Sequence, residues 1–471
     1  MNPRLPRSWR RAGPTGIVLV LCSSLASCSQ APEERGGTQS LKETIGRCRE
    51  EISRLRGLTS KDNIAAVVYP KSEFQKLIRA QLDGILSPQE TARCQRAYAK
   101  FGLLPPGFEL YKAYRELYEN SLGASYSPKT REIRLPRQGE VQDLQKEFLR
   151  LAGLESRGID CDRLALMHEL THAAQWDSFD VPGLFSRLDG GNNDLILAVQ
   201  SVIEGDATLV SWTHQLGNPG DETLGLIVGQ YKSGILAGMA GTLPWYLRQS
   251  LTFPYGYGTA FIAEFLKAKG GRLEEVNELF RDLPLSTEQI MHPEKFLNPD
   301  QRDYPVLITL PNLTHLFGAP WTETFTNVHG EFGIACLLKD AGSGERLSST
   351  RKTVPMGWGG DRYVVLEDGR ETTLYVWFST WDTEVDAERF YGAYRHLLEK
   401  KSGKQSLEQG NRVTFDAIKG RIFIEVRGKD VLVLDGASAD ILVKTEAIWE
   451  GVRKTEPMRL VCPRIQISDQ K

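Results

Sequence analysis

The sequence predicts an α+β protein, in which a mainly helical domain precedes a smaller α+β domain. Two observations support this fold class. Apolar residues recur at spacings of three and four over most of the chain before about Leu283, and short apolar runs typical of strands dominate after about Thr322. The chain has 471 residues, of which 41% are hydrophobic and 25% charged, which is typical of a soluble globular protein with two or three domains.

The net charge argues against a nucleic-acid partner. Four arginines lie within the first 28 residues, which contain no acid, so removing their charge from the formal −2 leaves −6 for the remainder. A slightly acidic body lacks the basic footprint of nucleic-acid-binding proteins. We therefore expect no nucleic acid as a partner, and the oligomeric state stays open.

Residues 1–28 are typical of an export signal, because arginines precede the short apolar run Ile17–Cys22 and small residues follow it. Leu25-Ala26-Ser27-Cys28 resembles the lipobox of bacterial lipoproteins. This resemblance implies lipidation of Cys28, a tether over residues 29–40 and attachment to the membrane of the cell envelope. Ser29 favours the outer membrane, with the protein facing the periplasm. The alternative is a plain secretory signal peptide.

Five cysteines remain once Cys22 and Cys28 are assigned to the signal. An exported protein can form disulfides, and Cys48 with Cys94 is the pair that we consider. The sequence leaves the pairing open.

The helical domain is expected over residues 41–321. Leu41–Tyr118 has helical periodicity, which is broken at Leu103–Gly107. Two short strands around a turn are predicted within Ser125–Leu135, and a helix-rich stretch follows. We expect the strand near Glu132–Leu135 to lie at a sheet edge, where an extended substrate could pair with it.

The smaller α+β domain is expected over residues 322–471. The predicted strands are 363–366, 373–378, 421–426 and 431–434, and the predicted helices are Val385–Lys401 and Ala439–Arg453. The glycine-rich Gly357–Arg362 has no Walker lysine and no dinucleotide-loop spacing, so it predicts a tight turn that leads into a strand. His329 and His396 stand alone and receive no role.

The most informative motif is His168-Glu169-Leu170-Thr171-His172. Residues four apart lie one turn above each other on a helix, so the two histidines can present nitrogens to one metal ion. Glu169 lies about 100° around the helix from His168, where it can reach a water on the metal instead of the metal itself. The motif therefore predicts a zinc ion, Zn²⁺, with Glu169 as general base.

A catalytic zinc ion needs three protein ligands and an open position. The second expected helix, Leu195–Leu216, contains Glu204 between apolar neighbours, where an unpaired carboxylate would be costly. Binding a cation would remove that cost, so Glu204 is the expected third ligand. Asp206 and His214 are the alternatives.

His168 to His172 together with Glu204 resembles the gluzincin branch of zinc metallopeptidases, the thermolysin-like arrangement. The segments HELTHAAQ, SPKTREI and IEGDATL resemble more closely a group of secreted bacterial zincin-like proteins, over about residues 103–297. The resemblance implies a zincin-like metallopeptidase domain, with these three residues as zinc ligands and Glu169 as catalytic base. One position departs, because thermolysin-type gluzincins hold a histidine with an aspartate where Thr208 stands.

Two further segments contain hydrogen-bond donors for the oxyanion that forms during peptide hydrolysis. Phe253–Gly258 offers Tyr255 and Tyr257 on what is expected to be a flexible turn, and the stretch before Pro293 contains His292. Tyr257 and His292 are the catalytic candidates, with Tyr255 beside them. Core packing of the tyrosines and helix capping near His292 are the alternatives.

The sequence thus predicts an exported, lipid-anchored zinc metallohydrolase, most simply a peptidase that acts on a peptide or protein substrate. The competing hypothesis is a zincin-shaped envelope scaffold whose C-terminal domain binds a partner. Such a scaffold would keep the fold and would not need Glu169.

Overall fold

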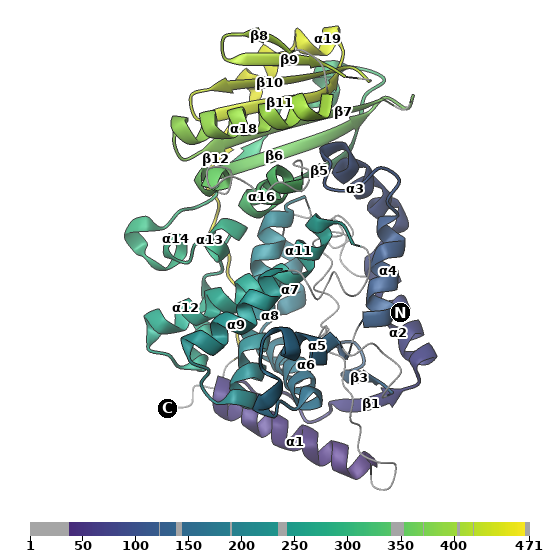
Figure 1. Ribbon diagram of the computed structural model, residues 1–471, viewed down its shortest axis with the longest axis vertical. Helices are drawn as coiled ribbons and strands as arrows, with labels where there is room; N and C mark the ends of the chain where they lie inside the picture. The colour runs from purple at the N-terminus through teal and green to yellow at the C-terminus, as the bar shows by residue number, and fades with distance from the viewer. Residues whose placement is uncertain are drawn as a thin grey trace.

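The computed structural model describes residues 37–121, 123–137, 144–188, 191–233, 243–340, 353–370, 372–402, 406–417 and 419–466. It confirms the predicted α+β class: helices fill the part of the chain before about residue 320, and a large sheet fills the part after it (Figure 1). The export signal with Cys28 and most of the tether lie outside the described residues.

The described part of the chain begins with four helices, and one short strand interrupts them. They are α1 (Gly37–Arg56), β1 (Ala65–Tyr69), α2 (Lys71–Ile85), α3 (Pro88–Phe101) and α4 (Leu110–Ser121). The helical prediction for Leu41–Tyr118 is therefore wrong at β1. Its sequence AAVVY favours a strand, but the strand is stabilised by parallel pairing with a segment far along the chain, which local periodicity does not reveal.

The predicted strand pair forms as β2 (Ser125–Ser127) and β3 (Glu132–Pro136). The sheet order is β1-β3-β2, so β3 has partners on both sides. The expectation that the strand near Glu132–Leu135 lies at a sheet edge is wrong, because β1 and β2 are the edge strands. The turn between the strands places Arg131 at a φ of 54°, and its guanidinium forms two hydrogen bonds with Asp177.

Two long helices, α6 (Cys161–Ser178) and α8 (Asn193–Leu216), form the centre of the helical part. Around them lie α5 (Leu144–Leu151), η2 (Glu155–Arg157), α7 (Val181–Arg187), α9 (Asp221–Ser233), α11 (Trp245–Phe253), η3 (Pro254–Gly258), α12 (Thr259–Lys269), η4 (Leu273–Arg281), α13 (Thr287–Met291), α14 (Glu294–Leu297) and η5 (Pro299–Gln301). Among the described residues, α8 is the one helix long and apolar enough to cross a membrane, but 94% of its apolar window is buried inside the protein, as in a core helix.

A seven-stranded antiparallel sheet has the order β5-β6-β7-β11-β10-β9-β8. Its strands are β5 (Thr322–Asn327), β6 (Trp358–Glu367), β7 (Thr373–Trp381), β8 (Ser406–Gln409), β9 (Arg412–Asp416), β10 (Arg421–Arg427) and β11 (Asp430–Ala437). The remaining elements are β4 (Leu307–Thr309), α15 (Leu313–Phe317), α16 (Gly330–Asp340), η6 (Val354–Gly357), α18 (Glu384–Ser402), α19 (Ala439–Leu442), α20 (Thr445–Gly451) and β12 (Arg453–Thr455).

All four strands predicted in this part are present, and α18 matches the first predicted helix. The second predicted helix is split into α19 and α20. The segment Gly357–Arg362 is largely strand, because β6 begins at Trp358 and the turn precedes it as η6. Cys48 and Cys94 are buried free thiols, so the disulfide that we considered is wrong.

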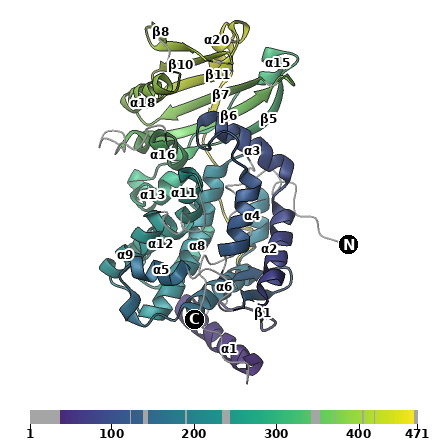
Figure 2. The ribbon, with the colours of Figure 1, turned by 45° about the vertical axis from the view of Figure 1, so that its right-hand side comes forward.

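Helices and sheet share one hydrophobic cluster across residue 322. Phe101, at the end of α3, packs edge-on against Tyr363 of β6 and Tyr375 of β7, with ring centroids 5.0 and 4.0 Å apart. Both ribbon views show α3 reaching the sheet, while α1 lies at the opposite end of the molecule (Figures 1 and 2). The helical part and the sheet are therefore packed together and not merely linked.

Candidate metal centre

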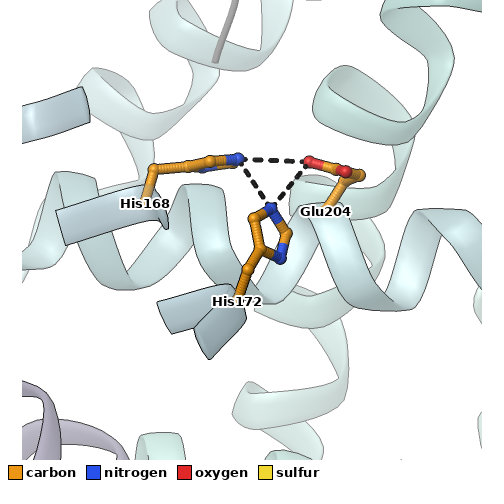
Figure 3. A group of neighbouring side chains, drawn as sticks. All are labelled: His168, His172 and Glu204. Carbon is orange, nitrogen blue, oxygen red and sulfur yellow. Dashed lines mark hydrogen bonds and ion pairs between the residues drawn. The ribbon is translucent and has the colours of Figure 1, made fainter. Parts of the chain in front are cut away.

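Three buried side chains from α6 and α8 converge on one point (Figure 3). Nε2 of His168 lies 3.2 Å from Oε2 of Glu204 and 3.0 Å from Nε2 of His172. The third separation, from His172 Nε2 to the same carboxylate oxygen, is 3.4 Å. The structure thus brings together the two histidines and the carboxylate that the sequence predicts as ligands.

Helix α6 presents both histidines on one side because they lie one turn apart. Asp160 caps the first turn by accepting a hydrogen bond from the backbone N–H of Arg163 at 3.1 Å. The helix is buried from Leu164 to Gln175 without interruption, so both imidazoles lie in the interior of the protein. His168 is 4% exposed and His172 is fully buried.

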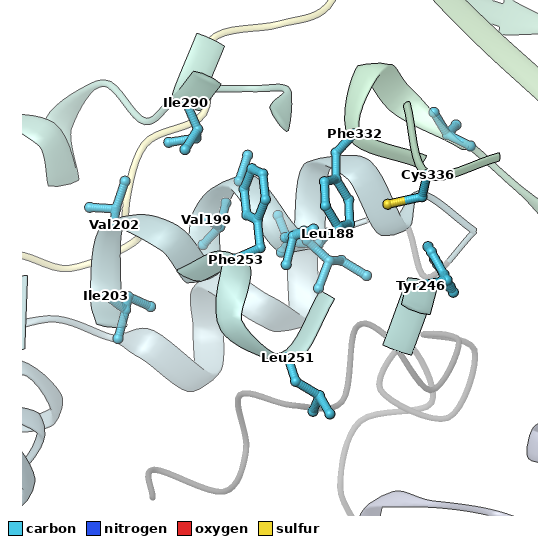
Figure 4. Packing of buried hydrophobic residues seen from close by; sticks show 14 of the residues in the cluster. Leu188, Val199, Val202, Ile203, Tyr246, Leu251, Phe253, Ile290, Phe332 and Cys336 are labelled. Atoms are coloured by element: carbon cyan, nitrogen blue, oxygen red, sulfur yellow. The ribbon is translucent and has the colours of Figure 1, made fainter. Parts of the chain in front are cut away.

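Helix α8 fixes Glu204 from the opposite side. Val199, Val202 and Ile203 are buried without exposure and lie among the apolar residues around Phe253 (Figure 4). Oε2 of Glu204 faces the histidines, whereas Oε1 is buried without a hydrogen-bond partner among the residues that the structure describes. A buried carboxylate oxygen without a partner is costly, and a cation beside the carboxylate would offset that cost.

The geometry and the chemistry of the three donors fit zinc. Four ligands at zinc–nitrogen distances of 2.0–2.1 Å stand about 3.3–3.4 Å apart at the corners of a tetrahedron. The three separations here, 3.0, 3.2 and 3.4 Å, are close to that edge length. Two imidazoles and one carboxylate are also a ligand set of catalytic zinc sites, in which the fourth corner stays open.

The electrostatics of the centre favour positive charge. Burial opposes the charged form of His172, but the carboxylates of Glu204 and Glu169 outweigh burial and raise its pKa to about 9. Burial likewise opposes ionisation of Glu204, yet the two histidines hold its pKa at about 2. Burial dominates at His168 and lowers its pKa. The carboxylate is therefore ionised, which is the form that a metal ligand must have.

Glu169 is fully buried, and its Oε2 accepts a hydrogen bond of 2.8 Å from the backbone N–H of Tyr126. Tyr126 is the middle residue of β2, which lies at one edge of the three-stranded sheet. The β-hairpin thereby orients the carboxylate of Glu169, which stands outside the group of three converging ligands. This is the placement expected of a general base.

The alternative third ligands have other partners. Asp206 accepts hydrogen bonds from Arg56 at 2.8 Å and from Gln175 at 2.9 Å. His214 faces Glu51 of α1, with Nδ1 and the carboxylate 3.7 Å apart. Neither belongs to the converging group, in which Glu204 is the acidic member.

Sequence reasoning missed the residue that holds His172. Nδ1 of His172 donates to Oε1 of Gln175 at 2.8 Å. Thr208 stands where thermolysin-type gluzincins have an aspartate, and its buried hydroxyl has no hydrogen-bond partner within the described chain. The available signal was the spacing, because Gln175 follows His172 by three residues and so shares its side of the helix.

The expected flexible turn Phe253–Gly258 is instead a buried π-helical turn, η3, between α11 and α12. A Cβ atom on Gly205 would stand 2.4 Å from the carbonyl carbon of Gly258, and one on Gly258 would stand 2.2 Å from the backbone oxygen of Ser201. Backbone therefore packs directly on backbone here, which explains both glycines. The contact places Tyr255 beside the metal centre, with its ring 6.0 Å from that of His168.

The contacts of Tyr257 and His292 that the structure describes are with residues other than His168, His172 and Glu204. The ring of Tyr257 stacks on Phe253 at 4.7 Å and lies 4.1 Å from the amino group of Lys232. Nε2 of His292 is hydrogen-bonded to Glu331 of α16 at 2.9 Å. Of the three residues predicted to stabilise an oxyanion, Tyr255 is the one whose ring contacts a predicted zinc ligand.

Comparison with known proteins gives a family match in the C-terminal part of the chain. A family model described as "Domain of unknown function (DUF8575)" matches residues 319–446, which include all seven strands of the large sheet and none of the three converging residues His168, His172 and Glu204. A search among curated proteins finds no match.

One solved structure is similar over part of the chain. It is titled "Crystal structure of a putative hydrolase with a novel fold from Chloroflexus aurantiacus" and is 17% identical. The match covers 63% of this chain and 99% of that chain, with a TM-score of 0.31. A likeness at this level identifies neither a shared fold nor a shared activity.

Proposed function

We propose that this protein is a zinc-dependent metallohydrolase that cleaves peptide bonds. The observation that supports the proposal is the convergence of His168, His172 and Glu204, with donor separations of 3.0–3.4 Å, beside a buried Glu169. A zinc ion at this position would supply Lewis-acid polarisation of a carbonyl group and would acidify water. The chain's own residues account for the remaining functions.

Glu169 is the proton carrier in this proposal. Its carboxylate accepts a proton from the attacking water and passes that proton to the leaving nitrogen of the cleaved peptide bond. The hydrogen bond from Tyr126 N–H holds one carboxylate oxygen in place during both transfers. Because the partner is a backbone group of β2, the orientation depends on the hairpin and not on a mobile side chain.

Tyr255 is the proposed donor to the oxyanion. Burial raises the pKa of its phenol well above the usual range, so the hydroxyl keeps its proton and can donate a hydrogen bond. The ring lies beside His168, on the turn that is clamped against α8. Tyr257 and His292 stay predictions from the sequence.

A peptide or protein is the proposed substrate, because the HExxH motif with Glu204 resembles that of zinc metallopeptidases; β2 lies at a sheet edge next to Glu169 but is buried at all three residues. The lipobox-like sequence before Cys28 further supports attachment of the protein to the cell envelope, where such substrates would be exported or envelope proteins.

Glu169→Gln tests the proposal. Glutamine keeps the size of the side chain and can still accept from Tyr126 N–H, but it cannot take up a proton. General bases contribute about 10²–10⁴-fold, so hydrolysis of casein by the zinc-loaded protein should fall at least about a hundredfold. Zinc content and melting temperature should stay close to those of the wild type.

Glu264→Gln, the same change on the exposed side of α12, is the matched control and should retain activity. Equal turnover by Glu169→Gln and wild type would contradict the proposed mechanism. Failure of the zinc-loaded wild type to cleave casein and a varied set of peptides would instead favour the binding scaffold.

A further inference from the structure

The Nδ1 side of His172, which faces away from the metal centre, is the start of a buried hydrogen-bond chain. Oε1 of Gln175 receives the Nδ1 proton, and Nε2 of the same amide donates to Asp206 Oδ2 at 2.9 Å and to the backbone oxygen of Ile203 at 3.1 Å. Asp206 in turn binds Nε of Arg56 at 2.8 Å. His172, Gln175, Asp206 and Arg56 are all fully buried.

The donors and acceptors in this chain have only one consistent assignment. Arg56 is always protonated, so Asp206 is its acceptor. The backbone oxygen of Ile203 is an acceptor as well, so the nitrogen of the Gln175 amide must face both groups and the amide oxygen must face His172. The Nδ1 atom of His172 therefore carries a hydrogen. In the neutral ring, this leaves the lone pair on Nε2, which is the atom that faces His168 and Glu204.

The chain ends in the first described helix. Arg56 is the last residue of α1, and its Nη1 also donates to Asn277 of η4 at 2.5 Å. An arginine with a fully buried side chain needs such partners, because an unpaired charge in the interior is costly. The ion pair of Arg56 with Asp206 thus connects α1, which lies at the end of the molecule far from the large sheet, to the ring of a predicted zinc ligand (Figure 1).

We propose that Gln175, Asp206 and Arg56 are positioning residues, which fix the ring orientation and the Nδ1 proton of His172 and thereby set the metal affinity. This inference rests on the proposed zinc-dependent function. Partners that hold the distal nitrogen of a metal-binding histidine commonly change metal affinity about 10–100-fold when they are removed.

Gln175→Met and Gln175→Glu test the proposal together. Methionine has a similar length but no acceptor for the Nδ1 proton, so the Kd for Zn²⁺, measured by competition with a chelator, should rise about 10–100-fold. Glutamate keeps that acceptor but places a second carboxylate beside Asp206. It should therefore retain zinc affinity better than methionine does, while its melting temperature falls further. If Gln175 had a purely structural role, the zinc affinity of each variant would follow its melting temperature.

Gln249→Met is the matched control, because Gln249 is a buried glutamine of α11 whose Nε2 has no hydrogen-bond partner in the described part of the chain. Its zinc Kd should equal that of the wild type. In ¹⁵N-histidine-labelled protein, a slowly exchanging imidazole N–H proton should be present in the wild type and in Gln249→Met and absent from Gln175→Met.

Two results would overturn the proposal, and they are distinguishable from failure of the function. If Gln175→Met binds zinc like the wild type, or keeps the imidazole N–H signal, the proposed role of the hydrogen-bond chain is wrong and the metallohydrolase proposal stands. If the wild type itself binds no zinc, the proposed function fails, and the role of the hydrogen-bond chain in metal affinity fails with it.

Discussion

His172 shows how a buried residue gains a defined chemical state from its surroundings. One ring nitrogen faces His168 and Glu204, and the other donates to Gln175. Neither contact alone fixes the ring, since an imidazole can rotate and can carry its proton on either nitrogen. Together, the two contacts define the orientation that metal binding requires.

Asp194 is a second buried residue with an unusual state, and it makes the stability of the protein pH-dependent. Burial raises its pKa to about 7, with the carboxylates of Asp361 and Glu331 adding to the shift, although Thr287 donates to it from both N–H and hydroxyl. The native state therefore keeps a proton that the unfolded state releases near pH 4. As the pH rises from about 4 to 7, this residue lowers the free energy of unfolding.

Asp194→Asn should remove this cost. The free energy of unfolding of the variant, relative to the wild type, should increase by about 2–3 kcal/mol between pH 5 and pH 8. Urea denaturation at several pH values measures this difference. Asp440→Asn, at an exposed position of α19, is the control, and its free energy of unfolding should change with pH as that of the wild type does. Parallel profiles for Asp194→Asn would show that Asp194 carries no excess proton.

Local rules were enough to predict the three converging side chains. Helical spacing places His168 and His172 together, and the cost of an unpaired carboxylate among apolar residues identifies Glu204. The role of Gln175 could not be predicted in the same way. It depends on Asp206 and Arg56, and these two residues are 150 positions apart in the chain.

At the scale of elements, the contact between α8 and η3 brings Tyr255 to the metal centre. The contact requires glycine at positions 205 and 258, because an added Cβ would stand 2.2–2.4 Å from backbone atoms that cannot move aside easily. The glycines in PYGYG are locally typical of a turn, whereas in the structure the segment is helical and packs on α8 and α9. The sequence therefore suggested a flexible turn where the structure has a clamped one.

Gly205→Ala should separate η3 from α8. Overpacking of this kind costs about 1–3 kcal/mol of stability, and the shift of Tyr255 away from His168 should lower kcat more than it raises KM. Gly84→Ala is the control, because Gly84 lies within α2 with open space around its Cβ position, and alanine there should stabilise the protein by up to about 1 kcal/mol. Equal stability of wild type and Gly205→Ala, measured by thermal melting, would contradict the clamp.

At the scale of the whole molecule, one hydrophobic cluster joins the helical part to the large sheet. The sequence predicted the change from helices to strands near Thr322, because that change is a matter of local composition. It did not predict the packing of Phe101 against Tyr363 and Tyr375, since aromatic side chains from distant segments meet only in the folded chain. The same limit hid the parallel pairing of β1 with β3.

The placement of the whole molecule in the cell depends on Cys28 in our proposal. Cys28→Ser removes the thiol that a lipid would modify, so the variant should leave the membrane fraction or accumulate with its signal uncleaved. Fractionation of cells and mass spectrometry of the mature N-terminus measure both effects. Unchanged membrane association together with an unmodified N-terminus in the wild type would contradict lipid attachment.

The most direct test of the central claim is the zinc content of the purified protein, measured by elemental mass spectrometry for the wild type, Glu204→Ala and His214→Ala. We expect about one zinc per chain in the wild type and in His214→Ala, and a large loss in Glu204→Ala, because three ligands are needed to hold the ion. Full zinc content in Glu204→Ala, or its loss in His214→Ala alone, would contradict the metal centre formed by His168, His172 and Glu204.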